Sequence, residues 1–105
     1  MKKLIVILVA LVGFGFSTYA GVIFRTTQTV CNGDEKVIFR NNGAVSVTTT
    51  SSRITGTYNI VDDGIEMYLD YEGETITIFV RATMSYNKSY LDWIVYDENT
   101  YERCN

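Results

Sequence analysis

Apolar and polar residues alternate along residues 55–80 in three runs, which two short polar turns separate at residues 62–64 and 72–74. A spacing of two is typical of a β-strand that buries one face. The residues expected to point inward on the second and third runs are Ile65, Met67, Leu69 and Tyr71, and then Ile76, Ile78, Val80, Ala82 and Met84. The pattern therefore predicts three consecutive antiparallel strands.

Five further segments are rich in β-branched and aromatic residues, and polar turns separate most of them. These segments are residues 21–30, 36–40, 44–50, 89–96 and 100–104. Short links favour antiparallel pairing of neighbouring strands. The sequence thus predicts an all-β fold, an up-and-down meander of seven to eight strands that closes into a small barrel or a curled sheet. A two-sheet sandwich is the alternative.

The N-terminal residues follow a different pattern. Residues 1–3 are basic at two positions, residues 4–12 form an unbroken apolar run, and residues 17–20 end at Ala20. This order is typical of a secretory signal peptide that is cleaved after Ala20. The alternative is a membrane anchor, but the apolar run is shorter than the roughly 20 residues that span a bilayer. We therefore expect a helical signal peptide over residues 1–20, one domain over residues 21–105, and a secreted or periplasmic protein.

The two cysteines, Cys31 and Cys104, lie near the two ends of the chain that follows Ala20. After export, such a pair favours one structural disulfide. Free or metal-binding thiols are the alternative, although the chain has no histidine and no third cysteine to complete a zinc site. A disulfide would draw the ends of the meander together, which favours the barrel over the sandwich.

The chain is acidic, with a formal net charge of −3, and loss of Lys2 and Lys3 with the signal peptide would make it −5. Its basic residues do not form a cluster. An acidic domain without a basic patch is a poor candidate for binding nucleic acid or anionic lipid. We expect no nucleic-acid partner and no membrane span after cleavage.

Three short motifs resemble those of a known group of proteins. They are Gly-Thr-Tyr-Asn-Ile at residues 56–60, Asp-Gly-Ile-Glu-Met at 63–67 and Tyr-Glu-Arg-Cys at 101–104. Over residues 40–104 the chain resembles the small exported lipocalin-like β-meander proteins of bacteria, and this resemblance implies a barrel that carries a small ligand. The early and late cysteines also resemble those of small periplasmic lysozyme inhibitors, which implies a protein partner.

Residues that could carry out catalysis are few. Histidine is absent, and a disulfide would leave no thiol nucleophile. Six carboxylates lie close together in the sequence, at Asp62, Asp63, Glu66, Asp70, Glu72 and Glu74. Facing carboxylates can hydrolyse glycosides, and acidic loops can bind calcium. The alternation places these six on an outer face and in turns, which favours a solvated acidic surface, so we expect no enzyme activity, no metal and no cofactor.

The candidate binding residues are aromatic. Tyr68, Phe79, Tyr90 and Tyr96 are expected on outer faces, where aromatic rings are typical of protein interfaces and of sugar-stacking surfaces. Trp93 is expected in the core, on the same face as Leu91 and Val95. The sequence thus indicates an exported, non-catalytic β-domain that binds an unidentified protein or glycan or has a structural role. A small-ligand carrier is the alternative, and nothing in the sequence indicates an oligomeric state.

Overall fold

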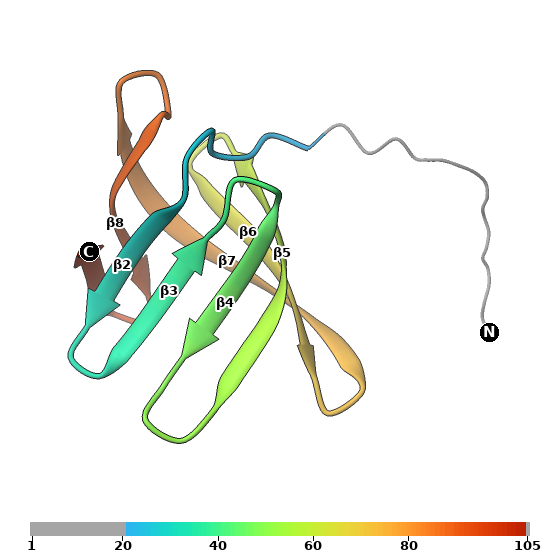
Figure 1. The fold of residues 1–105 in the computed structure, drawn as a ribbon. Helices are drawn as coiled ribbons and strands as arrows, with labels where there is room; N and C mark the ends of the chain where they lie inside the picture. The colour runs from blue at the N-terminus through green and yellow to red at the C-terminus, as the bar shows by residue number, and fades with distance from the viewer. Residues whose placement is uncertain (1–20, 105) are drawn as a thin grey trace, which may run out of the picture.

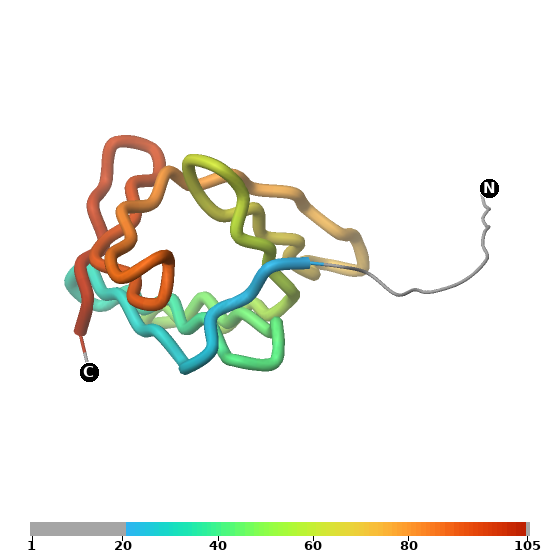
Figure 2. The backbone as a smooth tube through the Cα atoms, turned by 90° about the horizontal axis from the view of Figure 1, so that it is seen from above, coloured from blue at the N-terminus to red at the C-terminus, as the bar shows by residue number. Residues whose placement is uncertain are grey.

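The computed structural model describes residues 21–104, which form eight β-strands and no helix (Figure 1). The strands are β2 (Gln28–Asn32), β3 (Glu35–Phe39), β4 (Ala44–Thr48), β5 (Arg53–Val61), β6 (Gly64–Tyr71), β7 (Glu74–Ser85), β8 (Tyr90–Tyr96) and β9 (Asn99–Arg103). Each strand pairs antiparallel with the next, and β9 pairs with β2, so that the sheet closes into a barrel. Figure 2 looks down into the resulting ring of strands. The predicted all-β meander and its closure into a barrel are confirmed.

The predicted signal peptide, residues 1–20, lies outside the described residues. Within residues 21–104, no helix is long and apolar enough to cross a bilayer.

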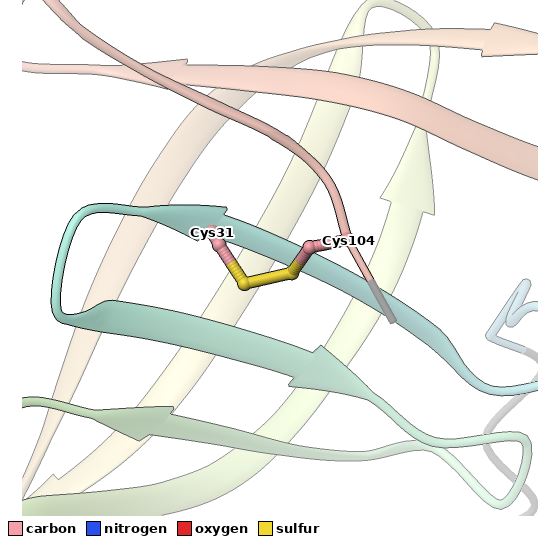
Figure 3. The surroundings of a disulfide bond; sticks show 2 residues. All are labelled: Cys31 and Cys104. Carbon is pink, nitrogen blue, oxygen red and sulfur yellow. A yellow bond between two sulfur atoms is a disulfide. The ribbon is translucent and has the colours of Figure 1, made fainter.

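The seam that closes the barrel is short. Strands β2 and β9 share two residue pairs, Val30 with Arg103 and Cys31 with Glu102. The Cys104 amide adds a hydrogen bond to the carbonyl oxygen of Thr29, at 2.9 Å. Next to it, the predicted disulfide between Cys31 and Cys104 is confirmed and joins β2 to the chain after β9 (Figure 3). A covalent bond therefore lies where the backbone pairing of the barrel is least extensive.

The first predicted strand, residues 21–30, is wrong in its boundaries. Residues 21–27 form no strand, and β2 runs from Gln28 through Cys31 to Asn32, which were predicted to begin a turn. The turn falls instead at Gly33, whose φ of +60° is a conformation that glycine adopts at little cost. The predicted strand at residues 44–50 is also too long, because the Thr49 hydroxyl accepts hydrogen bonds from the Ser51 and Ser52 amides and begins a loop.

Instead of forming a strand, residues 21–27 close one end of the barrel. The side chain of Phe24 is 1% exposed and packs against Phe39 and Tyr58, with ring centroids 6.0 and 5.9 Å away. Its backbone amide donates to the Tyr58 hydroxyl at 3.0 Å, and that hydroxyl donates to the Arg40 carbonyl oxygen at 2.7 Å. Burial raises the pKa of Tyr58, and the Phe24 hydrogen bond partly opposes this. We call this end, which carries the β3–β4, β5–β6 and β7–β8 turns, the plugged end.

The inward rows of β6 and β7 are confirmed along most of their length, since Ile65, Met67, Leu69 and Val80 are buried. Ile78, Ala82 and Met84 are partly buried against the same core. Tyr71 and Ile76 were also predicted to point inward. They are 46% and 40% exposed, so this prediction is wrong for these two residues. Pairing of β7 with β8 begins at Arg81, and the first half of β7 therefore pairs with β6 alone. The β6–β7 hairpin extends away from the barrel (Figure 1), which agrees with the exposure of these two side chains.

A β-bulge in β8 reverses the predicted facing of its second half. Thr83 of β7 lies opposite Trp93, whereas the next residue, Met84, lies opposite Leu91, which leaves Asp92 as an extra residue without a partner on β7. Such an insertion shifts all later side chains to the other face. Leu91 and Ile94 are accordingly both buried, and Trp93, predicted in the core, is 43% exposed on the outer wall.

Candidate functional site

The end of the barrel opposite Phe24 contains an apolar cavity of about 210 Å³. We call this end, which carries the β2–β3, β4–β5, β6–β7 and β8–β9 turns, the open end. Most of the cavity wall is formed by apolar, non-aromatic side chains. The other three lining residues are one glutamate and two tyrosines. The lining residues are Val37, Val47, Ile54, Met67, Leu69, Ile78, Val80 and Ile94, together with Glu35, Tyr96 and Tyr101.

The cavity exists because the two ends of the barrel are filled differently. At the plugged end, three aromatic rings occupy the interior, and Phe39 and Tyr58 lie 5.1 Å apart between centroids. At the open end the inward positions of β3 and β4 are the smaller Val37 and Val47. The β6–β7 turn and the first residues of β7 also extend beyond the wall on this side, because β7 pairs with β8 only from Arg81 onward. The interior is therefore blind at one end and reachable at the other.

A hydrogen-bonded pair lies at the rim of this cavity. The Tyr101 hydroxyl donates to Oε1 of Glu35 at 2.5 Å, which joins the last strand to the start of β3. Burial, together with the hydrogen bond and the negative charge of Glu35, raises the pKa of Tyr101 to about 12. The hydroxyl therefore remains a neutral donor at physiological pH, and the carboxylate of Glu35 keeps further acceptor capacity.

A second, polar hollow of about 360 Å³ adjoins the same rim. It is lined by Asn32, Gly33, Asp34, Glu35, Thr49, Thr50, Asn99 and Tyr101. Glu35 and Tyr101 line both spaces, so an apolar interior and a polar vestibule meet at this pair. Among the residues that the structure describes, no group of three or more histidine, cysteine or acidic side chains could hold a metal ion.

A larger hollow of about 520 Å³ lies outside the barrel, along the chain near Gly21 and the outward side of β5 and β6. Its lining mixes Asn42, Thr57 and Asn59 with Ile23. It lacks the continuous apolar wall that an inward strand face provides. The cavity inside the barrel is for this reason the better candidate for a ligand site, although its volume is smaller.

The four aromatic residues predicted as a partner surface do not lie together. Tyr96 lines the cavity at the open end, and the Tyr68 hydroxyl donates to Glu66 at 2.7 Å on the outer wall. Phe79 is 48% exposed and its ring lies over Gly64 of the neighbouring strand. Tyr90 is near the plugged end, where its ring packs edge-on against Tyr86. No single surface therefore contains all four.

Tyr90 belongs to a local cluster on the outer wall. The Arg103 guanidinium lies 5.9 Å from the centroid of the Tyr90 ring and forms an ion pair with Asp92 at 3.4 Å. Trp93 is the next residue after Asp92, and because of the bulge its side chain lies on the outer wall. We call Tyr86, Tyr90, Trp93 and Arg103 the outer aromatic cluster.

The six acidic residues of residues 62–74 are divided between the two ends of β6. Asp62 and Asp63 lie at the plugged end, in the β5–β6 turn, and Glu72 lies at the open end, in the β6–β7 turn. These turns are at opposite ends of an antiparallel sheet, so their carboxylates do not converge. On β6 itself, Glu66 accepts a hydrogen bond from the Tyr68 hydroxyl, and Asp70 accepts one from the Thr75 hydroxyl.

The sequence did not single out Glu35, which the structure places at the rim of the cavity. One signal was present, because Glu35 precedes Val37 and Phe39 at a spacing of two and thus shares their inward register. A charged residue in an inward row marks the point where that row reaches the end of the barrel. Tyr101 occupies the matching inward position near the start of β9.

No protein-family model matches the chain, no curated protein matches its sequence, and no solved structure matches it. Its function must therefore be inferred from its own residues and their geometry.

Proposed function

We propose that the protein is an exported, non-catalytic binding protein that takes a slender apolar ligand into the open end of its barrel. The observation that carries this proposal is the cavity of about 210 Å³, whose wall is formed mainly by aliphatic side chains. Pockets that enclose drug-sized ligands span about 300–1,000 Å³. A smaller, narrow space suits an alkyl chain better than a fused ring system. The disulfide is compatible with export.

Energetics favour a chain that extends inward from the rim. Each methylene group that leaves water contributes about 0.8 kcal/mol, or roughly a fourfold gain in affinity. The affinity for a series of linear alcohols should therefore rise with chain length until the cavity is filled, and then stop rising. The buried residues Phe39, Ile65 and Leu91 fill the interior beyond the cavity and set this limit.

Filling the cavity with an indole ring should abolish this binding. Ile78 is partly buried on the wall, and Ile78→Trp would occupy the space that a ligand needs. We expect the affinity for 1-octanol, measured by titration calorimetry, to fall by about tenfold or more, which corresponds to 1.4 kcal/mol. Overpacking at a partly buried site should lower the free energy of unfolding by about 1–3 kcal/mol.

Thr77→Trp is the matched control, because Thr77 precedes Ile78 on β7 and is exposed on the outer face. This variant should bind 1-octanol as the unmodified protein does. Equal losses in both variants, or no binding of any alcohol by the unmodified protein, would contradict the proposed cavity function. Backbone amide shifts on addition of 1-octanol should centre on the cavity-lining residues of β3, β6, β7 and β8.

A second candidate function is binding of a protein or glycan through the outer wall. The observation that favours it is the outer aromatic cluster, in which Trp93 and Tyr90 are each 43% exposed and Tyr86 is 76% exposed. Exposed tyrosine and tryptophan beside arginine are the residues most often found at the energetic centre of interfaces.

Trp93→Ala tests this second function. The side chain is on the outer wall, so the melting temperature should change little, whereas capture of a specific partner from the native host should be lost. Ile78→Trp serves as the opposite control and should retain that partner. If Trp93→Ala unfolds the domain or leaves capture unchanged, the outer aromatic cluster is not a binding surface.

A further inference from the structure

The cavity at the open end is amphipathic along its length. Its interior wall is aliphatic, whereas the adjoining hollow of about 360 Å³ is lined by amide, hydroxyl and carboxylate groups. Glu35 and Tyr101 belong to both, so a ligand that fills the interior must pass its other end beside the Glu35 carboxylate. Such a site requires a ligand with one apolar and one polar end.

The charge at this end is strongly one-sided. Three of its four turns contribute a pair of carboxylates. These are Asp34 with Glu35, the first residue of β3; Glu72 with Glu74, the first residue of β7; and Asp97 with Glu98 between β8 and β9. The basic residues at this end are Lys36, in the outward register next to Glu35, and Arg53, at the start of β5. The carboxylates near β3 and the β8–β9 turn, with those of the extended β6–β7 hairpin farther out, favour cations at the mouth of the barrel.

One of these carboxylates occupies a backbone position for which other residues are better suited. Asp97 and Glu98 have φ of +51° and +68°, in a two-residue turn where asparagine, aspartate and glycine are preferred. Turn chemistry therefore explains Asp97 but not Glu98.

We propose that the ligand is a single-chain aliphatic amine in its protonated form. The alkyl chain fills the aliphatic interior, and the ammonium group lies at the rim against the Glu35 carboxylate, next to the Tyr101 hydroxyl. A neutral head group would gain no charge attraction there, and a carboxylate head group would be repelled. This inference rests on the proposed apolar-ligand function and adds the charge of the head group.

Three probes of equal chain length separate the two ideas. Octylammonium, 1-octanol and nonanoate present the same octyl chain with a positive, neutral or negative end at pH 7. We expect octylammonium to bind about fivefold more tightly than 1-octanol, as for a partly exposed ion pair, and nonanoate to bind more weakly than both. The advantage of octylammonium should shrink in about 1 M salt, where the Debye length is about 3 Å.

Glu35→Gln should remove the preference, so that octylammonium no longer binds more tightly than 1-octanol. The amide keeps an acceptor oxygen for the Tyr101 hydroxyl, so the rim retains its hydrogen bond. Glu102→Gln is the matched control with the same change in net charge. Glu102 is exposed and lies opposite Trp93 on the outer wall, so this variant should keep the preference.

The outcomes distinguish the two proposals. If all three probes bind equally well and Ile78→Trp weakens all of them, the cationic head group is wrong and the apolar cavity stands. If nonanoate binds most tightly, or if both glutamine variants lose the preference to the same degree, the role of Glu35 is wrong. If none of the probes binds, both proposals fail together.

Discussion

Replacement of Cys31 and Cys104 with serine is expected to lower the free energy of unfolding by about 4 kcal/mol, the loop-entropy value for a closure of 73 residues. The loss is large because domains of this size have a total stability of only about 5–15 kcal/mol. The location of the bond adds to it, since β2 and β9 share only two residue pairs. Without the bond, the short seam must hold the barrel closed by itself.

Urea titration of the oxidised protein and of the double serine variant measures this difference. The reduced unmodified protein should have nearly the same midpoint as the serine variant, because both lack the covalent bond. A variant whose midpoint stays near that of the oxidised protein would show that backbone pairing alone closes the barrel. Reduction should also increase hydrogen exchange first at Val30 and Cys31, the two β2 residues paired with β9.

The second large loss is expected for Phe24→Ala, which should lower the free energy of unfolding by about 3–5 kcal/mol. Phe24 is 1% exposed and contacts the rings of Phe39 and Tyr58. Its removal would open the plugged end and leave a cavity between those rings. Phe24 belongs to residues 21–27, which form no strand and lie over the end of the barrel. To refill the space, this whole segment would have to move.

Phe79→Ala is the control of the same residue type. Its ring is 48% exposed on the outer wall and covers Gly64, so its loss should be much smaller than that of Phe24. Equal losses for the two variants in urea titration would contradict the role of residues 21–27 as a plug.

The fold was predictable because its determinants are local. Alternation at a spacing of two and turns rich in Gly, Asn and Asp are visible in the sequence, and they fix the strands and their antiparallel order. The motif at residues 56–60 also has a physical reason. A Cβ atom on Gly56 would lie 1.9 Å from the carbonyl oxygen of Tyr68, so the close approach of β5 and β6 requires glycine there.

The bulge in β8 was not predictable in the same way. The sequence of residues 89–96 alternates without interruption, and the extra residue at Asp92 is defined only by its pairing with β7. The exposure of Tyr71 and Ile76 likewise depends on where β8 begins to pair, far along the chain. Errors of this kind arise because strand facing is fixed by tertiary pairing once a register shift occurs.

The cavity depends on how the two ends of the barrel are filled, which sequence patterns do not show. Both ends of the barrel have inward apolar rows, and the position of residues 21–27 over one end, which tertiary packing sets, helps to decide which end is filled. Glu35 shared the inward register, but a spacing of two does not show whether a row ends in solvent or against a neighbour. Tyr96, predicted as an outer partner residue, lines the cavity because the bulge moved it to the inner face.

The position of Trp93 determines how the folding of this protein can be observed. It is the only tryptophan in the chain, and it emits from the outer wall rather than from the interior. Its fluorescence should therefore be accessible to aqueous quenchers in the folded protein and should shift little in wavelength on denaturation. Near-ultraviolet dichroism of the buried rings of Tyr58 and Tyr101 would follow the loss of packing, which the indole reports poorly.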